Sequence, residues 1–495
     1  MKTRLSIISL ATVFAFLLAS CGGSDVSQSG GASTTTGWEY NSPDNGGFEV
    51  VQQYDQETGP GLVFIEGGTF TMGRVEQDLM YDWNNVPRRV TVTSFYMDET
   101  EIRNVDYREY VYWLKRVFVD NPEISQNALP DTLVWRSPLA FNEPYVEYYY
   151  RHPSYNEYPV VGVNWLQASD YCIWRTDRVN EKTLIDEGIL EPDPNQLNEE
   201  NFNTEAYLAG QYTGLVRQNL PSLTNDGAER IVRLEDGIML PRYRLPTEAE
   251  WEFAAVALIG NSYDERVYER RIYPWNGHNL RQDDKKARGE MRANFVRGRG
   301  DYMGTAGDLN DNGAITVPVK SYWPNDYGLY CMAGNVSEWV ADVYRPLSAE
   351  DVNEFRPFRG NVFTEVARNP DGSIASKDSM GRLKRVEMTE ERIGDRQNFS
   401  KSDYRNYSDG DINSSLDFVQ KETAGQDGSG RMYAQKGSDM SSLVNDETRV
   451  YKGGSWKDRA YWLSPGTRRF LHQEEAREDI GFRCAMIRVG SPAGY

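Results

Sequence analysis

The sequence predicts a protein that combines β-strands and α-helices. Two observations carry this prediction: apolar and polar residues alternate in the early part of the chain, and further on apolar residues recur with helical spacing behind N-cap residues. The chain has 495 residues, of which 39% are hydrophobic, so it can bury a substantial core. Its formal net charge of -20 gives no indication of nucleic-acid binding and is typical of a solvated surface.

The first residues have the features of a bacterial lipoprotein signal. Basic residues precede an apolar run at 5–18, and Leu18-Ala-Ser-Cys21 follows the pattern of a lipobox. We therefore expect cleavage after residue 20 and lipidation of Cys21, because several acyl chains together make a stable membrane anchor. The alternative is an ordinary cleaved signal with an incidental cysteine. Gly22 follows without a neighbouring acid, which predicts the outer membrane, and we expect the domain on its periplasmic face. The alternative is surface exposure, since Asp25 is nearby, but one acid is a weak export signal.

Glycine, serine and threonine dominate residues 22–37, so this stretch has almost nothing to bury. We expect residues 21–60 to be the lipidated cysteine and a flexible tether. Sixteen disordered residues hold a domain on the order of 20 Å from its anchor. No later stretch reaches the 18 apolar residues of a membrane span, so the lipid is the attachment that the sequence predicts.

Strands are expected at the start of the globular part. Residues 61–73 predict a strand, a glycine turn and a second strand in which Phe70 and Met72 alternate with polar residues. The alternation resumes at Val90 and continues to Met97, which predicts a further strand.

Three helices are expected after these strands. Asn104 is a plausible N-cap for a helix with an apolar stripe, and Asn164 for a second helix that carries Cys172 on its buried face. Thr247 and Glu250 form a capping box that begins the third. The stripe of the first helix predicts core packing; its members are Tyr107, Tyr110, Val111, Leu114, Val117 and Phe118.

Seven short motifs occur in a fixed order: Gly67-Gly-Thr-Phe-Thr-Met-Gly73, Asp98-Glu-Thr-Glu-Ile102, Val161-Gly-Val-Asn-Trp165, Arg244-Leu-Pro-Thr-Glu-Ala-Glu-Trp-Glu252, Tyr273-Pro-Trp-Asn276, Gly334-Asn-Val-Ser-Glu-Trp339 and Gly453-Gly-Ser455. In this order they resemble the formylglycine-generating-enzyme (sulfatase-modifying factor) family, and Gly481-Phe-Arg-Cys484 resembles the strand that ends its domain. The resemblance implies one α+β, C-type-lectin-like domain at 61–490, with little regular secondary structure.

The resemblance also implies a loss of catalysis. Active members place a copper-binding cysteine pair at the third and eighth residues after the Ser of Gly-Gly-Ser, and here those positions are Asp458 and Leu463. We therefore expect no enzyme activity and no copper or iron. Asp458 could instead pair with Arg459 or present charge to a partner.

Two stretches exceed the plain family pattern, at about 180–241 and 346–448. Insertions of this length are normally functional or disordered. We expect the first to bind a partner, since residues 181–189 have a helical pattern, and for the second we leave partner binding and disorder open.

Further motifs resemble the lipoproteins of this family that serve gliding motility and type IX secretion, of the GldJ or the GldK (PorK) type. They are Thr36-Gly-Trp38, Asp78-Leu-Met-Tyr-Asp-Trp-Asn-Asn85, Ala128-Leu-Pro-Asp-Thr-Leu-Val-Trp135, Thr176-Asp-Arg-Val-Asn-Glu181 and Arg299-Gly-Asp-Tyr-Met-Gly304. This resemblance implies a scaffold with GldK/PorK- and GldN/PorN-type ring components as partners. The alternatives are a divergent oxidase with other ligands, or a calcium-stabilised module that binds a glycan or peptide.

The remaining cysteines do not suggest catalysis. By the family resemblance Cys172 and Cys484 pair as a structural disulfide, the alternative being two buried thiols. Cys331 has no histidine near it in sequence, which favours a buried apolar role over a nucleophile. The three histidines, His152, His278 and His472, are isolated from one another.

Structural calcium is the one ion that the family resemblance implies. One family site would use Asn294 and Asp311 here. A second would use Glu338, but its usual asparagine position is Cys331, and a thiol is a poor calcium ligand.

Overall fold

The computed structural model describes residues 31–51, 55–74, 79–82, 84–224, 227–259, 271–296, 313–345, 358–360, 362, 364–388 and 447–490. The expected signal, Cys21, Asp311 and most of the second insertion lie outside these residues. The chain divides into two compact units. Of the residues that the structure describes, one unit contains those up to Asp55 together with those of Val216–Ile238, and the other contains those of Gln56–Leu215 and those from Met239 onward. No helix in the described part of the chain is long and apolar enough to cross a bilayer.

The larger unit contains two four-stranded sheets. The first, in the order β1-β4-β14-β7, is antiparallel throughout; its strands are β1 (Leu62–Ile65), β4 (Phe95–Asp98), β14 (Ala485–Ile487) and β7 (Tyr243–Arg244). The second, in the order β12-β11-β8-β13, consists of β12 (Arg469–His472), β11 (Thr448–Lys452), β8 (Ser337–Val343) and β13 (Ile480–Gly481). In both sheets the end of the chain pairs with strands that are distant in sequence.

The strand expected from Val90 to Met97 is two strands. β3 (Arg88–Val92) forms a separate hairpin with β2 (Gly68–Met72), and the chain then crosses into β4 of the first sheet. Ser94 marks the crossing, because its hydroxyl accepts the backbone N–H of Gly67 at 3.0 Å. Gly67 is required there, since an added Cβ would lie 2.4 Å from the carbonyl oxygen of Val92.

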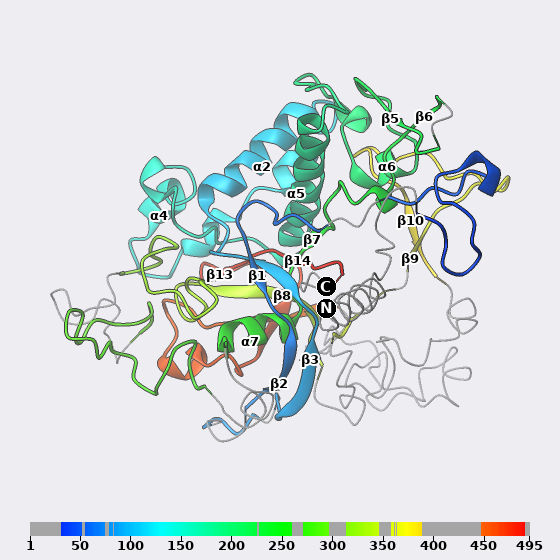
Figure 1. Cartoon of the computed structure of the whole chain (residues 1–495). Coiled ribbons are helices and arrows are strands. Elements are labelled where there is room, and N and C mark those ends of the chain that lie inside the picture. The colour runs from blue at the N-terminus through cyan, green and yellow to red at the C-terminus, as the bar shows by residue number, and fades with distance from the viewer. Residues whose placement is uncertain are drawn as a thin grey trace, which may run out of the picture. The chain divides into compact units, whose positions relative to one another are not determined.

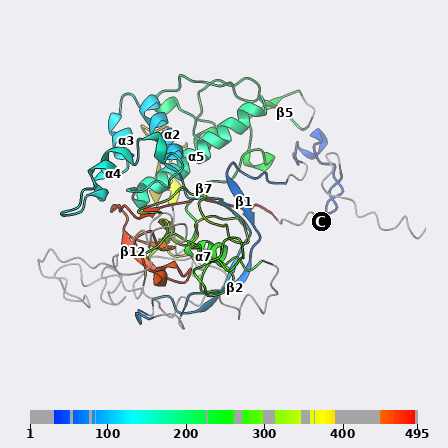
Figure 2. The same ribbon diagram turned by 90° about the vertical axis from the view of Figure 1, so that its left-hand side faces the viewer.

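Helices cover this framework. They are α2 (Asn104–Val117), α3 (Pro122–Asn127), α4 (Glu143–Tyr148), α5 (Trp165–Asp186), α6 (Thr204–Leu208) and α7 (Glu248–Val256). Short 3-10 turns connect several of them: η2 (Thr132–Trp135), η3 (Pro153–Tyr155), η4 (Asn198–Glu200) and η8 (Ala460–Leu463). The long helices α2 and α5 lie side by side in both views (Figures 1 and 2).

Two of the three expected N-caps are confirmed. The side chain of Asn164 accepts the N–H of Gln167 at 2.8 Å, and Thr247 accepts that of Glu250 at 3.2 Å. The expected cap at Asn104 is wrong: the N-cap is Arg103, and Asn104 is the first residue of α2. Its amide instead donates to backbone carbonyls outside the helix, so a tertiary contact replaces the local one.

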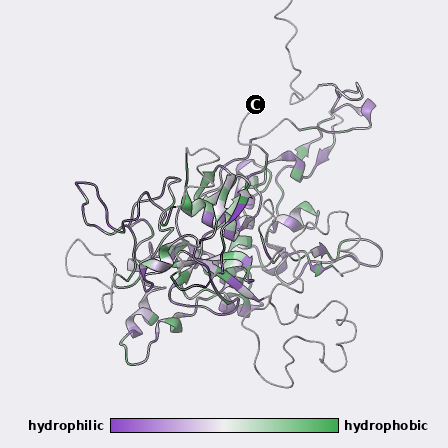
Figure 3. Ribbon diagram, turned by 90° about the horizontal axis from the view of Figure 1, so that it is seen from below, coloured by the Kyte–Doolittle hydropathy of each residue, from purple (hydrophilic) through white to green (hydrophobic). Residues whose placement is uncertain are grey.

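The core lies where α2 and α5 pack against the sheets. Tyr107 of α2 stacks on Tyr171 of α5, with ring centroids 5.6 Å apart, and both rings meet the edge of Phe482. The expected stripe of α2 faces this core, with Val111 partly buried and its other members buried. Apolar residues accordingly lie along the inner strands and helices in Figure 3.

The smaller unit differs from the expected tether. It contains the turn η1 (Pro43–Asn45), the short pair β5 (Leu220–Pro221) and β6 (Glu229–Arg230), and η5 (Leu234–Asp236). Glu49 connects its two segments by accepting the N–H of Leu223 and pairing with Arg233, both at 2.8 Å. Residues 31–51 therefore fold with the later part of the first insertion.

The rest of the first insertion packs against the described part of the second. The expected helical pattern at 181–189 is partly confirmed, because α5 continues to Asp186. The second insertion contributes a two-stranded hairpin of β9 (Thr364–Val366) and β10 (Arg385–Glu387), which lies beside α6 in Figure 1. Arg385 pairs with Glu205 of α6 at 2.8 Å, and Asn201 donates to the carbonyl of Met380 at 2.8 Å. The part of the first insertion around α6 and the described part of the second insertion thus pack together.

Candidate functional site

The chain turns sharply where the family places its catalytic segment. After β11, Gly453 and Gly454 adopt φ values of +97° and +69°, which only glycine adopts without strain. A Cβ on Gly454 would lie 2.8 Å from the carbonyl oxygen of Trp462. The turn therefore depends on the glycine pair. It places Ser455 and Asp458 within hydrogen-bonding distance of each other and of residues further along the chain.

Asp458, at the first cysteine position, is held in a partly buried ion pair. Its carboxylate accepts hydrogen bonds from both Nη atoms of Arg469, at 2.8 and 2.6 Å, and from the Ser455 hydroxyl at 2.7 Å. The expected pairing with Arg459 is wrong, because the cation comes from β12. The rings of Trp462 and Tyr451 flank the Arg469 guanidinium at 4.6 and 4.8 Å. These contacts fix the carboxylate and neutralise its charge.

Leu463, at the second cysteine position, is fully buried at the end of η8. It packs in an apolar cluster whose other buried members are Met291, Ala293, Phe295 and Ala333. An ion pair and an aliphatic side chain thus occupy the two positions at which thiolates would hold copper. Neither group is a copper ligand of that kind.

A second carboxylate lies on the other side of Ser455. Asp479 is buried, its Oδ2 is 3.2 Å from the Ser455 hydroxyl, and Lys457 approaches its Oδ1 at 3.2 Å. Burial raises the pKa of Asp479, although Lys457 opposes the shift. The sequence analysis missed Ser455, Arg469 and Asp479 as parts of this site, because they converge only through the pairing of β11 with β12 and of β8 with β11 and β13.

The cysteines lie in the interior. Cys172 of α5 and Cys484 bring their sulfurs to 3.3 Å as free, buried thiols, and the disulfide between them stays a prediction. The Cys331 thiol donates to the carbonyl of Val319 at 3.4 Å, and burial raises its pKa, which suits an inert apolar role.

Histidines take up local contacts. His472 is 2.9 Å from Glu447, and His152 accepts the N–H of Ser154 at 3.2 Å. His278 lies in an exposed turn.

Asn294 fits the first implied calcium site. Its Oδ1 is buried with no hydrogen-bond partner among the described residues, while its Nδ2 donates to the carbonyl of Ile315 at 2.7 Å. A buried oxygen without a donor is a suitable cation ligand. Gly313 lies close to Asn294 in space, since a Cβ on Gly313 would be 3.1 Å from Asn294 Nδ2. Calcium at Asn294 stays a prediction, because Asp311 lies outside the described residues.

The residues present do not fit the second implied site. Both oxygens of Glu338 already bind Arg483, at 2.7 and 2.6 Å, and Trp251 donates to one of them at 2.7 Å. A thiol stands at Cys331, where the family has an oxygen ligand. Sequence reasoning missed Glu101, a buried carboxyl group that accepts from Asn335. Burial, reinforced by Glu338, raises the pKa of Glu101 well above its usual range.

Comparison with known proteins shows similarity to one domain family. Residues 47–487 match the model of the sulfatase-modifying factor enzyme 1-like domain. The formylglycine-generating enzyme of Mus musculus is 26% identical over 373 residues, which is 68% of this chain and 78% of the relative. The inactive C-alpha-formylglycine-generating enzyme 2 of the same organism is 26% identical over 339 residues, 63% of this chain and 77% of the relative. The solved structure of PvdO from Pseudomonas aeruginosa aligns with a TM-score of 0.39 and 14% identity, over 86% of this chain and 93% of that one.

Proposed function

We propose that this chain, which belongs to the sulfatase-modifying factor enzyme 1-like domain family, is a non-catalytic member that acts as a structural or assembly component. The observation that carries the proposal is the state of the closing segment. The Asp458–Arg469 ion pair and the buried Leu463 occupy the positions of the copper-binding thiols. The family contains formylglycine-generating enzymes and inactive relatives, so an inactive member has precedent within it.

The same proposal assigns a place of action. The lipobox ending at Cys21 supports attachment to the outer membrane by lipid, with the domain on the periplasmic face. The motif resemblance supports a role in type IX secretion and gliding motility, with GldK/PorK- and GldN/PorN-type ring components as partners. In this role the lipid sets the position, the folded domain supplies rigidity, and the insertions supply the contact surface.

One experiment tests the absence of catalysis. The purified chain is supplied with copper and a cysteine-containing sulfatase peptide, and conversion of cysteine to formylglycine is followed by mass spectrometry. The mouse formylglycine-generating enzyme serves as the positive control. We expect no conversion and no stoichiometric copper, since Asp458 and Leu463 supply no thiolate. Conversion above the peptide-only background would overturn this part of the proposal.

A second experiment tests the assembly role. Membranes carrying a C-terminally tagged chain are extracted in mild detergent, and captured proteins are identified by mass spectrometry. A deletion of 346–448 is run alongside. We expect the secretion-ring components to be captured, and the deletion to weaken their capture. Recovery of a lone monomer with stoichiometric copper or iron would refute the scaffold role.

A further inference from the structure

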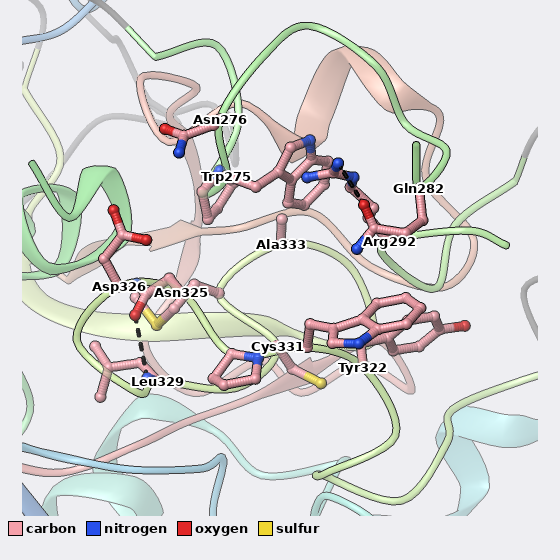
Figure 4. Close-up of a pocket in the computed structure, with 14 residues that line it drawn as sticks. Trp275, Asn276, Gln282, Arg292, Tyr322, Asn325, Asp326, Leu329, Cys331 and Ala333 are labelled. Carbon is pink, nitrogen blue, oxygen red and sulfur yellow. Dashed lines mark hydrogen bonds between the residues drawn. The ribbon is translucent and has the colours of Figure 1, made fainter. Parts of the chain in front are cut away.

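A cleft with a cavity volume of about 340 Å³ opens in the larger unit, lined by residues from three separate segments (Figure 4). Pro274–Asn276 contributes one wall, Gln282 and Arg292 contribute the next, and residues 322–333 contribute the opposite wall. Its size falls at the small end of ligand pockets, enough for one compact ring system with a polar group.

Aromatic rings line this cleft. Trp275 is held in a fixed orientation, since its indole N–H donates to the carbonyl of Asn279 at 2.8 Å and its ring stacks on Tyr273 with centroids 5.1 Å apart. On the opposite wall Tyr322 is buried, whereas Trp323 next to it is 46% exposed. An indole left half in solvent contributes little to the core, and exposed rings beside a concave surface are typical of ligand contacts.

The charge of the cleft is unusual for so acidic a chain. Arg292 carries the only positive charge among the described lining residues, and no carboxylate of the described part of the chain pairs with it. Its Nη2 donates to Gln282 Oε1 at 2.7 Å, and its Nε is buried with no partner among the same residues. Partly buried guanidinium groups are normally paired, and this chain has 74 acidic residues with which it could pair.

Two other polar side chains of the cleft are already engaged. Asp326, the one acid in the lining, forms an ion pair at 2.8 Å with Arg271, which lies outside the lining. Asn325 accepts the N–H groups of Tyr327 and Leu329, and its amide donates to Ala254 at 2.8 Å. Figure 4 shows Arg292 on the same side as Trp275 and Gln282, facing the side formed by Tyr322 and Cys331. An anionic group is therefore the polar partner that the cleft lacks.

We propose that this cleft binds a ligand with an aromatic ring and a carboxylate, the ring against Trp275 and Trp323 and the carboxylate on Arg292. A planar guanidinium binds carboxylates in a defined geometry, and flat rings stack on indoles. The ligand chemistry is shared by small aryl acids and by the C-terminal aromatic residue of a polypeptide. Asp458 does not line this cleft, and the proposal does not depend on the scaffold role.

Isothermal titration of the purified chain tests this site. Indole-3-acetate is the probe, and indole-3-acetamide is its uncharged counterpart. We expect the acid to bind with a Kd of about 1 mM or tighter, and the amide at least about tenfold more weakly, because only the acid supplies the missing charge. Two further probes are N-acetyl-L-tryptophan and a peptide that ends in phenylalanine. Their affinities, compared with that of indole-3-acetate, distinguish a small-molecule ligand from the C-terminus of a polypeptide.

Matched variants locate the binding. Arg292→Gln is expected to weaken the acid at least about tenfold while leaving the amide unchanged, and Arg292→Lys to weaken it less. Trp323→Ala, at the exposed rim, is expected to weaken both probes several-fold without affecting folding. Arg288→Gln, an exposed arginine in the same segment, is the control and should leave both affinities unchanged.

Several results would overturn the proposal. Equal affinities for acid and amide would show that the charge of the ligand does not contribute to binding. Equal effects of Arg292→Gln and Arg288→Gln would show that the ligand does not bind at Arg292. Absence of binding at several millimolar acid, with the wild-type chain folded by circular dichroism, would refute the site itself.

Discussion

Lys452→Met should destabilise the chain strongly, because this lysine is fully buried in an ionic cluster. Its Nζ lies 2.8 Å from Glu252 and 3.2 Å from Glu248, and both carboxylates are 2% exposed or less. Glu248 also binds Arg468, and its backbone N–H donates to Asp342 at 2.6 Å. Breaking a buried ion pair by removal of one partner costs about 3–5 kcal/mol, since the other charge stays buried without compensation. We expect a loss of that size in the free energy of unfolding.

Urea denaturation followed by tryptophan fluorescence measures this loss, with Trp251 in the neighbouring helix α7 fully buried. Lys182→Met is the matched control, because Lys182 and Asp186 pair on the exposed surface of α5 and should contribute less than about 1 kcal/mol. The double variant Lys452→Met/Glu252→Gln should recover part of the loss. If Lys452→Met costs no more than Lys182→Met, the buried cluster does not stabilise the fold in the way argued.

Three other predictions concern single sites. Arg469→Met should lower the free energy of unfolding, measured by thermal denaturation, by about 2–3 kcal/mol, because it leaves the Asp458 carboxylate without its cation. Asp458→Asn should lower it by about 1 kcal/mol, since an amide still accepts a hydrogen bond. Burial and the neighbouring Glu248 raise the pKa of Asp342 to about 7 from 3.8, so the folded chain holds a proton that the unfolded chain loses, and the free energy of unfolding should fall as the pH rises from about 4 to about 7. Asp342→Asn should remove up to about 4 kcal/mol of that fall, measured by urea denaturation at each pH. Calcium should raise the Tm of the wild-type chain and leave that of Asn294→Ala unchanged.

Each of these has a contradicting result. Equal costs for Arg469→Met and Asp458→Asn would show that the pair is not a buried ionic contact. Parallel pH profiles for wild type and Asp342→Asn would place the proton on another group. If calcium still raises the Tm of Asn294→Ala, the ion does not bind at Asn294.

Contacts between residues close in sequence could be predicted from the sequence, and contacts between distant residues could not. The caps at Asn164 and Thr247 follow from neighbours three residues away, so sequence spacing was sufficient. Asn104 has the same chemistry, but carbonyls more than forty residues away take its amide. Asp458 likewise pairs with Arg469 through strand pairing rather than with the adjacent arginine. The unpaired charge of Arg292 could not be recognised at all, because sequence does not show which acids are out of reach.

The strand order of the first sheet determines when the molecule can fold. β14 lies between β4 and β7, so the centre of the sheet is empty until residues 485–487 have been synthesised. Pairs such as Ala485 with Met97 close loops of almost four hundred residues, and contacts so distant in sequence are associated with slow folding. Until then β4 and β7 each have an edge whose backbone N–H and C=O groups are unpaired, and such edges are templates for aggregation. Truncation near the C-terminus is therefore expected to abolish the whole sheet rather than shorten it.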